Sequence, residues 1–408
     1  KAMGVARDRF NLISRNGSDE STGTDSKANK IDAGVTFARV KVDADLTDNV
    51  STTVRLINER LWGADADSGA NGTASVDVDL ASVTMKEFLY SPLTLSVGRQ
   101  ELRYGNALVI GDPDSNITSY SALGTATAPG GNVRDLSLRK SFDSVKAILD
   151  YNPLVLDVFY SQPAGTAYNR HAKTDLYGVN ARYDTGIRNT IVEGYYFGRV
   201  IGSNTTATNG DAAFAGLSKT DTLHTIGARV SSVPLDNLSL QGELAYQFGN
   251  YNPRYDVNAA TTNRVLGATG VNGTATTTGN RSAWAAQVIA DYKIKVKFDP
   301  RIGGSYSYFS GEKNNRSDGT FHAWTAPYED QTSGDIINAI FAPSNAHVFT
   351  VTAGAKPMSD LSVDLTYVYL RLAKKLNSGG NYNATVAGFD RPIAILSGVS
   401  TTSTSYYM

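Results

Sequence analysis

The chain has 408 residues, a formal net charge of −1, 38 glycines, 22 tyrosines and no cysteine. A charge this close to neutral excludes a strongly basic nucleic-acid binder, and the lack of any run of about 18 apolar residues excludes a transmembrane helix. A hydrophobic content of 41% is low for this length, and is typical of a β-barrel whose inner wall is polar and whose outer wall carries only a thin apolar band.

The first residues predict a strand near the start of a mature chain. The sequence begins at Lys1 rather than at a methionine, as expected after removal of a signal peptide. Residues 7–15 form a candidate strand, and the polar residues 18–29 form a loop.

Residues 31–48 and 50–62 are the clearest pair of strands. On the first, apolar side chains alternate with a charged set, namely Arg39, Lys41, Asp43 and Asp45. The second mirrors this pattern, with Arg55 and Glu59 on its polar face. A soluble sheet rarely carries such a run of charges opposite its core, so we expect the charged face to be in contact with water. The tight turn at residues 46–49 joins the two strands into an antiparallel hairpin.

The stretch LTLSVGRQELRYGNALVIG, residues 93–111, begins as a strand and then changes phase. Beyond Gly98 the apolar residues are Leu102 and Tyr104, on the opposite parity from those before it. The formerly apolar side now carries Arg99, Glu101 and Arg103. A bulge at Gly98 or the end of the apolar band would account for the change, as in a strand that leaves a membrane or bends within a barrel wall.

The same alternation recurs along the rest of the chain. It predicts strands at residues 75–86, 143–151, 154–160, 176–184, 190–199, 222–232, 238–248, 283–293, 301–309, 348–355 and 361–370. Short turns alternate with long polar loops, namely residues 106–133, 202–218, 250–280 and 311–346. The pattern predicts an all-β, closed antiparallel transmembrane β-barrel of about 16 to 18 strands, with short periplasmic turns and long extracellular loops. Residues 319–325 have no clear assignment, and residues 391–408 alternate only weakly.

Aromatic residues gather at the ends of the predicted strands. The set is Tyr90, Tyr104, Tyr151, Tyr160, Tyr183, Phe248, Tyr292 and Tyr308. Two girdles at the lipid interfaces would explain this distribution. Ordinary enrichment of aromatic residues in strands is the alternative.

The stretch Gly98-Arg99-Gln100-Glu101-Leu102, followed by Tyr104-Gly105-Asn106 and Ile110-Gly111, resembles a signature of the alginate-export family of outer-membrane barrels. Later stretches occur in the order seen in that family, namely residues 141–147, 234–236, 243–249, 283–286, 300–303 and 308–311. The resemblance implies 18 strands in one barrel domain over residues 1–408. It also implies an Arg-rich constriction that favours anionic polysaccharide, with Arg39, Arg55, Arg99 and Arg103 as the best matching positions. It does not identify a substrate.

Parity predicts which charged side chains line the pore. The basic set comprises Arg39, Lys41, Arg55, Arg99, Arg103, Lys146, Arg182, Arg229 and Arg301. The acidic set comprises Asp43, Glu59, Glu101, Asp157, Glu193 and Glu243. Rings of fixed charge in a narrow pore select solutes by sign, so the basic set would guide anions, with Glu59 and Glu101 as counter-charges. The alternative is a paired network that only rigidifies and hydrates the wall, because acids nearly balance bases.

The sequence offers no catalytic, metal or cofactor site. Its four histidines have no metal-ligand spacing, and no nucleophile elbow or phosphate-binding loop is present. The acidic residues 112–116 could bind Ca²⁺, but a solvated turn fits their composition better. We therefore expect a protein that is neither an enzyme nor a cofactor carrier.

These features predict a porin or channel of the bacterial outer membrane for small or oligomeric polar solutes, with a preference for anions. The alternative is a structural or interaction barrel that is plugged by its own loops or holds a periplasmic or surface partner. Expected partners are outer-membrane lipid and lipopolysaccharide, polar or anionic solutes, and a second copy or a periplasmic protein. Nucleic acid is not expected.

Overall fold

The computed structural model describes residues 2–11, 30–61, 76–113, 138–163, 174–201, 220–251, 279–311, 320–331, 343–374 and 405–407. These residues contain 17 strands. The first nine are β1 (Ala2–Asn11), β2 (Lys30–Thr47), β3 (Val50–Leu61), β4 (Asp77–Met85), β5 (Leu93–Glu101), β6 (Ser141–Asp150), β7 (Leu154–Gln162), β8 (Thr174–Asp184) and β9 (Ile191–Ile201). The others are β10 (Asp221–Leu235), β11 (Leu238–Tyr251), β12 (Gly279–Lys293), β13 (Arg301–Phe309), β14 (Thr320–Phe321), β15 (Ala346–Met358), β16 (Leu361–Leu372) and β17 (Ser405–Tyr407). The described part of the chain contains no helix long and apolar enough to cross a membrane.

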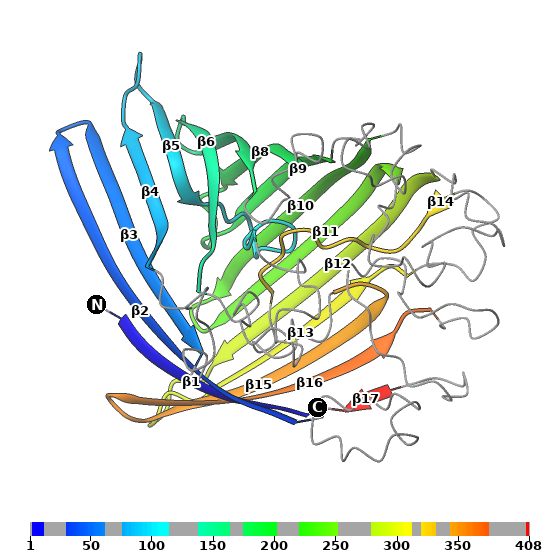
Figure 1. Ribbon diagram of the computed structural model, residues 1–408. Helices are drawn as coiled ribbons and strands as arrows, with labels where there is room; N and C mark the ends of the chain where they lie inside the picture. The colour runs from blue at the N-terminus through cyan, green and yellow to red at the C-terminus, as the bar shows by residue number, and fades with distance from the viewer. Residues whose placement is uncertain are drawn as a thin grey trace, which may run out of the picture.

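The strands form one strongly curved antiparallel sheet (Figure 1). Each strand from β1 to β13 pairs with its chain neighbours, β15 continues the wall beside β13, and β16 and β17 follow. The two-residue β14 pairs in parallel with β12. Apart from β14 and β17, the strands have 9 to 18 residues, which confirms the predicted all-β antiparallel architecture. Within the described residues, the pairings do not return from β17 to β1, so closure and the predicted count of 18 strands stay predictions.

The connections differ sharply between the two edges of the sheet. At one edge the strands are joined by 2 to 7 residues, as in the β2–β3, β6–β7 and β10–β11 turns. At the other edge consecutive wall strands are separated by 11 to 39 residues. This alternation follows from the antiparallel order, and it confirms the predicted pattern of short turns and long loops.

The outer face of the sheet is apolar and exposed. In one row of directly paired residues, Val83, Val97, Val145 and Tyr160 lie side by side across β4 to β7. Each of these side chains is more than a third exposed. A continuous exposed apolar band is unusual on a water-soluble protein and is expected where a wall faces lipid.

Aromatic rings follow this outer face near both edges. Tyr151, Tyr183 and Tyr292 are exposed beside the short turns. Near the long connections, the ring of Tyr196 on β9 stacks on His224 of β10 with centroids 5.9 Å apart, and the ring of Phe248 on β11 lies tilted against His224 at 5.3 Å. Tyr104 does not belong to a girdle, because its side chain is buried in the interior.

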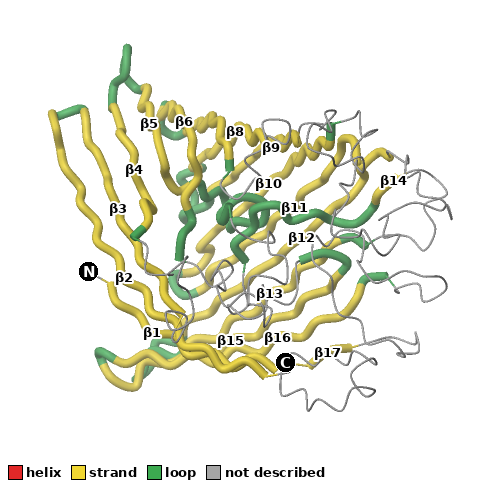
Figure 2. Tube along the Cα trace, viewed as in Figure 1, coloured by secondary structure: helices red, strands yellow, loops and turns green. Residues whose placement is uncertain are grey.

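The interior holds two segments of loop, which we call the first inner segment (residues 102–113) and the second inner segment (residues 320–331). Figure 2 shows them, apart from the short β14 (Thr320–Phe321), as loop that crosses the space enclosed by the strands. Ile110 and Tyr328 form a parallel β-bridge between them. The amides of Gly111 and Asp112 donate to the Tyr328 carbonyl over 2.7 and 3.0 Å, and the Asp330 amide donates to the Ala107 carbonyl over 3.0 Å.

A hydrophobic core joins the inner segments to the inner face of the wall. The buried side chains of Leu102, Leu108 and Ile110 belong to the same cluster as Trp324 and Tyr328. The wall contributes a set of large residues from several strands, namely Phe142, Phe159, Leu176, Tyr195, Phe197 and Phe309. The ring of Tyr104 stacks on Phe159 with centroids 5.2 Å apart. The inner segments are therefore packed parts of the fold rather than solvated loops.

The phase change after Gly98 is explained by the end of β5. The pairing of β5 with β4 and β6 keeps its register through Gly98 and Arg99, without a bulge. After Glu101 the chain leaves the wall, and Leu102 and Tyr104 enter the interior core. Gly98 itself has a φ of +121°, and a Cβ placed there would lie 2.2 Å from the Ala81 carbonyl oxygen.

Candidate functional site

The inner face of β2 to β4, together with Glu101 at the very end of β5, carries a compact charged cluster. Arg55 on β3 donates from Nε to Asp79 Oδ2 over 2.5 Å and from Nη2 to Glu101 Oε1 over 2.6 Å. Arg39 on β2 lies 3.5 Å from the same Asp79 oxygen. Two arginines thus share one carboxylate, and Glu101 supplies a second counter-charge.

Asp79 reaches this cluster because β4 is irregular. The register of β3 and β4 shifts between Arg55 and Leu56, which skips Asp79 in the pairing. Without the shift, Asp79 would share the outer face with Ala81 and Val83. The bulge turns its carboxylate inward, where it is completely buried.

Two further pairs extend the charged wall. Lys41 Nζ lies 3.0 Å from Asp43 Oδ2, and both side chains are exposed on the inner face of β2. Asp43 also accepts a hydrogen bond from the Thr53 hydroxyl over 2.7 Å. Glu59 lies 3.3 Å from Arg139 and accepts from the Leu138 amide over 2.7 Å, which ties the chain before β6 to β3.

Four of the predicted charges fall into one row across β8 to β11. Arg182 lies directly opposite Glu193, Glu193 opposite Arg229, and Arg229 opposite Glu243. The signs therefore alternate from strand to strand, which is the favourable arrangement for cross-strand pairs. Arg229 binds Glu193 as an ion pair and donates to Gln241 over 2.6 Å.

The first inner segment lies directly against this row. Glu243 is buried and accepts a hydrogen bond from the Tyr195 hydroxyl over 2.7 Å. Gly105 has a φ of +56°, and a Cβ there would lie 3.0 Å from Arg229 Cδ and 3.6 Å from Glu243 Oε2. Asn106 donates from Nδ2 to Gln287 Oε1 over 2.9 Å. Beneath the inner segment, the charges of the row are structural partners of one another.

Arg103 lies in the first inner segment rather than on the wall. It forms an ion pair with Asp330 of the second inner segment. Lys140 pairs with Asp112 and lies 3.4 Å from Asp330. Burial alone would lower the pKa of Lys140, but the two carboxylates raise it above its ordinary value. The four groups connect both inner segments to the start of β6.

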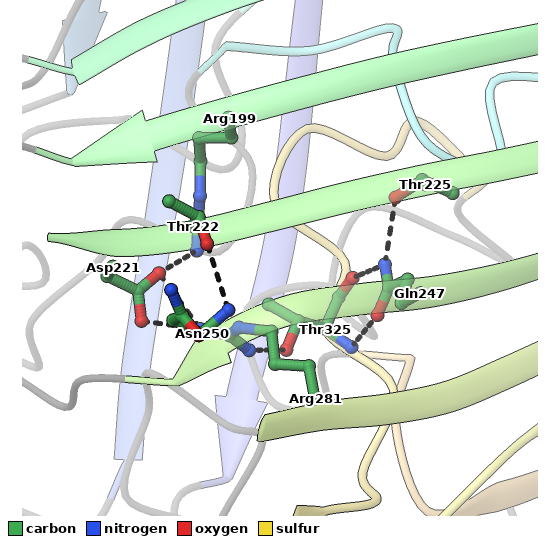
Figure 3. Close-up of polar contacts among 8 residues, drawn as sticks. All are labelled: Arg199, Asp221, Thr222, Thr225, Gln247, Asn250, Arg281 and Thr325. Atoms are coloured by element: carbon green, nitrogen blue, oxygen red, sulfur yellow. Dashed lines mark hydrogen bonds and ion pairs between the residues drawn. The ribbon is translucent and has the colours of Figure 1, made fainter. Parts of the chain in front are cut away.

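A second polar contact anchors the second inner segment to the wall (Figure 3). Gln247 Nε2 donates to the Thr325 carbonyl over 2.7 Å, and the Thr325 amide donates back to Gln247 Oε1 over 3.0 Å. Arg281 donates to the Thr325 hydroxyl over 3.2 Å and to both carboxylate oxygens of Asp221 over 2.9 and 2.7 Å. Arg199 lies 3.5 Å from Asp221 as well.

The buried and exposed ion pairs of this wall predict different stability effects. The side chains of Arg281 and Asp221 are only 4% and 8% exposed, whereas those of Arg301 and Asp364 are 46% and 40% exposed. We expect Arg281→Met to lower the free energy of unfolding by about 3–5 kcal/mol, because it leaves Asp221 buried without its closest partner. Arg301→Met should cost less than about 1 kcal/mol. Urea titrations in detergent, followed by heat-dependent gel mobility, would compare the two variants. Equal losses in the free energy of unfolding would contradict the expected difference between the buried and the exposed ion pair.

The remaining predicted positions are dispersed. Lys146 and Asp157 lie on the inner face, opposite Phe159 and Asn180. Arg301 lies near the short-turn edge and donates from Nε to Asp364 over 2.8 Å.

Arg99 differs from its predicted orientation toward the pore. Its register partners are Ala81 and Asp143, and it shares the outer face with Val97. Its Nε lies 3.4 Å from Asp143 Oδ1, and its Nη1 donates to the Val78 carbonyl over 3.0 Å. Because β5 has no bulge, its alternation continues through Arg99 and places it outside.

Several carboxylates important to the charge balance were absent from the predicted set. Asp79 was missed because a bulge changes its face. Asp330 was missed because nothing in the local pattern shows which distant segment enters the interior. Asp221 was missed because it is the first residue of β10, one residue before the predicted strand. With these residues included, nearly every predicted arginine has an acidic partner, so the inner surface is mixed in sign rather than basic.

Two of the four histidines lie on the outer face of the wall. His224 and His347 accept or donate through Nδ1 with the hydroxyls of Tyr196 and Tyr306, over 2.8 and 2.9 Å, on the outer face. His322 is in the second inner segment, and His171 lies outside the described residues. Of the predicted calcium loop, Asp112 pairs with Lys140, and residues 114–116 lie outside the described residues. Within the described ranges, no group of three or more acidic, His or Cys side chains could hold a metal ion.

Comparison with solved structures finds only distant likeness. The chain is similar to OmpF of Salmonella typhi in complex with daunomycin, at 14% identity, with 95% of this chain and 92% of that chain covered and a TM-score of 0.42. It is similar to in-vitro folded OmpT of Vibrio cholerae, an outer membrane protein, at 11% identity, 91% and 86% coverage and a TM-score of 0.42. It is also similar to a mutant of Rh. blastica porin, at 11% identity, 90% and 94% coverage and a TM-score of 0.37.

The sequence comparison is more specific. No curated protein matches the chain. The profile described as "Alginate export" matches residues 6–392, which is most of the chain. With a curved antiparallel wall that is apolar outside and charged inside, this match establishes that the protein belongs to the alginate export family and is an outer-membrane channel protein of the bacterial envelope.

Proposed function

We propose that the protein is a passive channel for small or oligomeric polar solutes, without enzymatic activity. The observation that supports it most is the exposed charged inner face of β2 and β3, which lies beside inner segments that narrow the interior. Lys41 and Asp43 remain exposed on that face, although Leu80 of β4, in the same row as Lys41, is buried. A solvated charged surface inside an apolar wall is what a polar solute requires to cross a membrane.

Closure of the wall is part of the proposal. β1 and β17 each have one partner strand within the described residues, β2 and β16. An unpaired strand edge in lipid would leave backbone amides and carbonyls unsatisfied, at several kcal/mol per group. We therefore infer that β1 meets the C-terminal part of the chain, which would complete a barrel of up to 18 strands with its short turns in the periplasm.

A preference for anions is the finer part of the proposal, and we expect it to be modest. It rests on Arg39, Lys41 and Arg55, which present three cationic groups on one wall. Asp79, Asp43 and Glu101 offset much of this charge at 2.5 to 3.5 Å. A mixed inner surface suits polar solutes of either sign and selects only weakly among them.

A second function is favoured by a specific observation. The inner segments share a buried hydrophobic core with the wall, which suits a barrel that is plugged by its own loops and serves as a structural or interaction protein. Such a barrel would hold a periplasmic or surface partner, or a second copy of itself, instead of passing solutes. The two functions differ in whether a continuous aqueous path remains beside the inner segments.

Single-channel recording in a planar bilayer under a KCl gradient would distinguish the two functions. We expect a stable conductance with a small reversal potential of anion-selective sign. Replacing Lys41 by Gln should reduce that potential, because one exposed cationic group is lost from the inner wall. Protein that is folded by its heat-dependent gel mobility, yet gives no conductance, would contradict the open channel and favour the plugged barrel.

A further inference from the structure

The arrangement of Arg39 and Arg55 poses an electrostatic problem. The two arginines project from neighbouring strands β2 and β3 toward the same carboxylate oxygen, so their guanidinium groups lie close together. Like charges at short distance repel, and the repulsion is stronger where water is scarce. Their side chains are only 20% and 14% exposed, so solvent screens them weakly.

Asp79 is the group that holds the two arginines together. Its Oδ2 lies 2.5 Å from Arg55 Nε and 3.5 Å from Arg39 Nε. Its Oδ1 has no hydrogen-bond partner within the described structure, and neither have Nε and Nη2 of Arg39. The two arginines are therefore balanced by the carboxylates of Asp79 and Glu101, although several polar atoms of the cluster make no hydrogen bond. Removing one carboxylate would leave the cluster with a net positive charge.

Asp79 is buried in the wall, although its charge acts on the arginines of the inner face. It is completely buried, so it lies behind the two arginines and does not itself contact solvent. A bulge in β4 brings it there from the parity of the outer face. A bulge that re-aims a side chain is a typical device beside a functional surface.

We propose that Asp79 is a positioning residue that sets the ion selectivity of the channel, by holding Arg39 and Arg55 side by side and cancelling part of their charge. This inference rests on the proposed channel function. Glu101 completes the cancellation from the exposed side, through its contact with Arg55 Nη2. The interior next to β2 and β3 is therefore nearly neutral because of a carboxylate that solutes never touch.

The test is the reversal potential of Asp79→Asn in a planar bilayer under a KCl gradient. Asn keeps the shape and one acceptor oxygen for Arg55 but removes the negative charge. We expect the permeability ratio of chloride to potassium to rise about threefold, and to rise further at low salt, where screening is weaker. Asp79→Glu retains the charge and should stay near the wild-type ratio.

Asp143→Asn is the matched control. It also removes one carboxylate beside an arginine, but Asp143 pairs with Arg99 on the outer face of the same wall. Its permeability ratio should equal that of the wild type. An Asp79→Asn ratio equal to that of Asp143→Asn would overturn the inference while leaving the channel function intact, whereas a wild-type protein without conductance would overturn the channel function itself.

If Asp79→Asn does not fold, a charge-balanced background keeps the inference testable. The double variant D79N/R39Q loses one charge of each sign, and it is compared with R39Q alone. We expect the double variant to be more anion-selective than R39Q, because it lacks the carboxylate that cancels Arg55. Equal reversal potentials for these two variants would overturn the inference.

Discussion

Replacing the second inner segment with a Gly/Ser sequence of the same length is expected to raise the single-channel conductance several-fold. Residues 320–331 contribute Trp324 and Tyr328 to the interior core and pair with the first inner segment. Without these side chains, the segment loses both its packing and its ion pair with Arg103. The interior would then be wider in the half that lies toward the long connections.

The size of this effect distinguishes a narrowed channel from a plugged barrel. A plugged barrel would change from no conductance to a large one, whereas a narrowed channel would change from a small conductance to a larger one. An equal-length Gly/Ser replacement of residues 294–299, in the exposed short connection between β12 and β13, is the control and should leave the conductance nearly unchanged. A folded variant of residues 320–331 that conducts like the wild type would contradict the role given to the inner segments.

Gly98→Ala is expected to be the most destabilising single-methyl change in the described wall. The backbone at Gly98 has a φ of +121°, where a residue with a side chain is strained by about 1–3 kcal/mol. The added Cβ would also lie 2.2 Å from the Ala81 carbonyl oxygen. Because that oxygen is backbone in the neighbouring strand, relief requires β4 and β5 to separate, which also disturbs the bulge that holds Asp79.

Gly194→Ala provides the comparison for this substitution. Gly194 lies on β9, and a Cβ there would meet nothing within 4 Å. Urea unfolding in detergent, followed by tryptophan fluorescence and gel mobility, should show a large loss for Gly98→Ala and almost none for Gly194→Ala. Similar stability of the two variants would mean that the backbone at residue 98 can relax at little cost.

The sequence predicted the wall of this protein far better than its interior. Strand alternation depends only on the period of two between neighbouring side chains, so β2, β3 and most later strands were predicted to within a few residues. The row of Arg182, Glu193, Arg229 and Glu243 was likewise predicted to face inward, because each lies in an uninterrupted strand. Their direct pairing could not be predicted, since it depends on the register between strands.

The errors came from places where alternation stops or changes. Arg99 was assigned to the pore because a bulge at Gly98 or the end of the apolar band was expected to turn the residues after it, although β5 keeps its register through Arg99. Asp79 was omitted because a bulge has no reliable sequence signal. The polar stretches that contain the inner segments were read as solvated loops, because their few large residues, such as Trp324, become informative only once their partners on distant strands are known.

The burial of the inner segments predicts which parts of the protein antibodies can reach on an intact cell. They belong to the two longest connections between wall strands, residues 102–140 and 310–345. Part of each connection lies inside the wall, where Trp324, Leu108 and Ile110 are almost completely buried. Antibodies raised against peptides from residues 102–113 or 320–331 should therefore fail to label intact cells, and epitope tags for surface display belong in connections that do not turn inward.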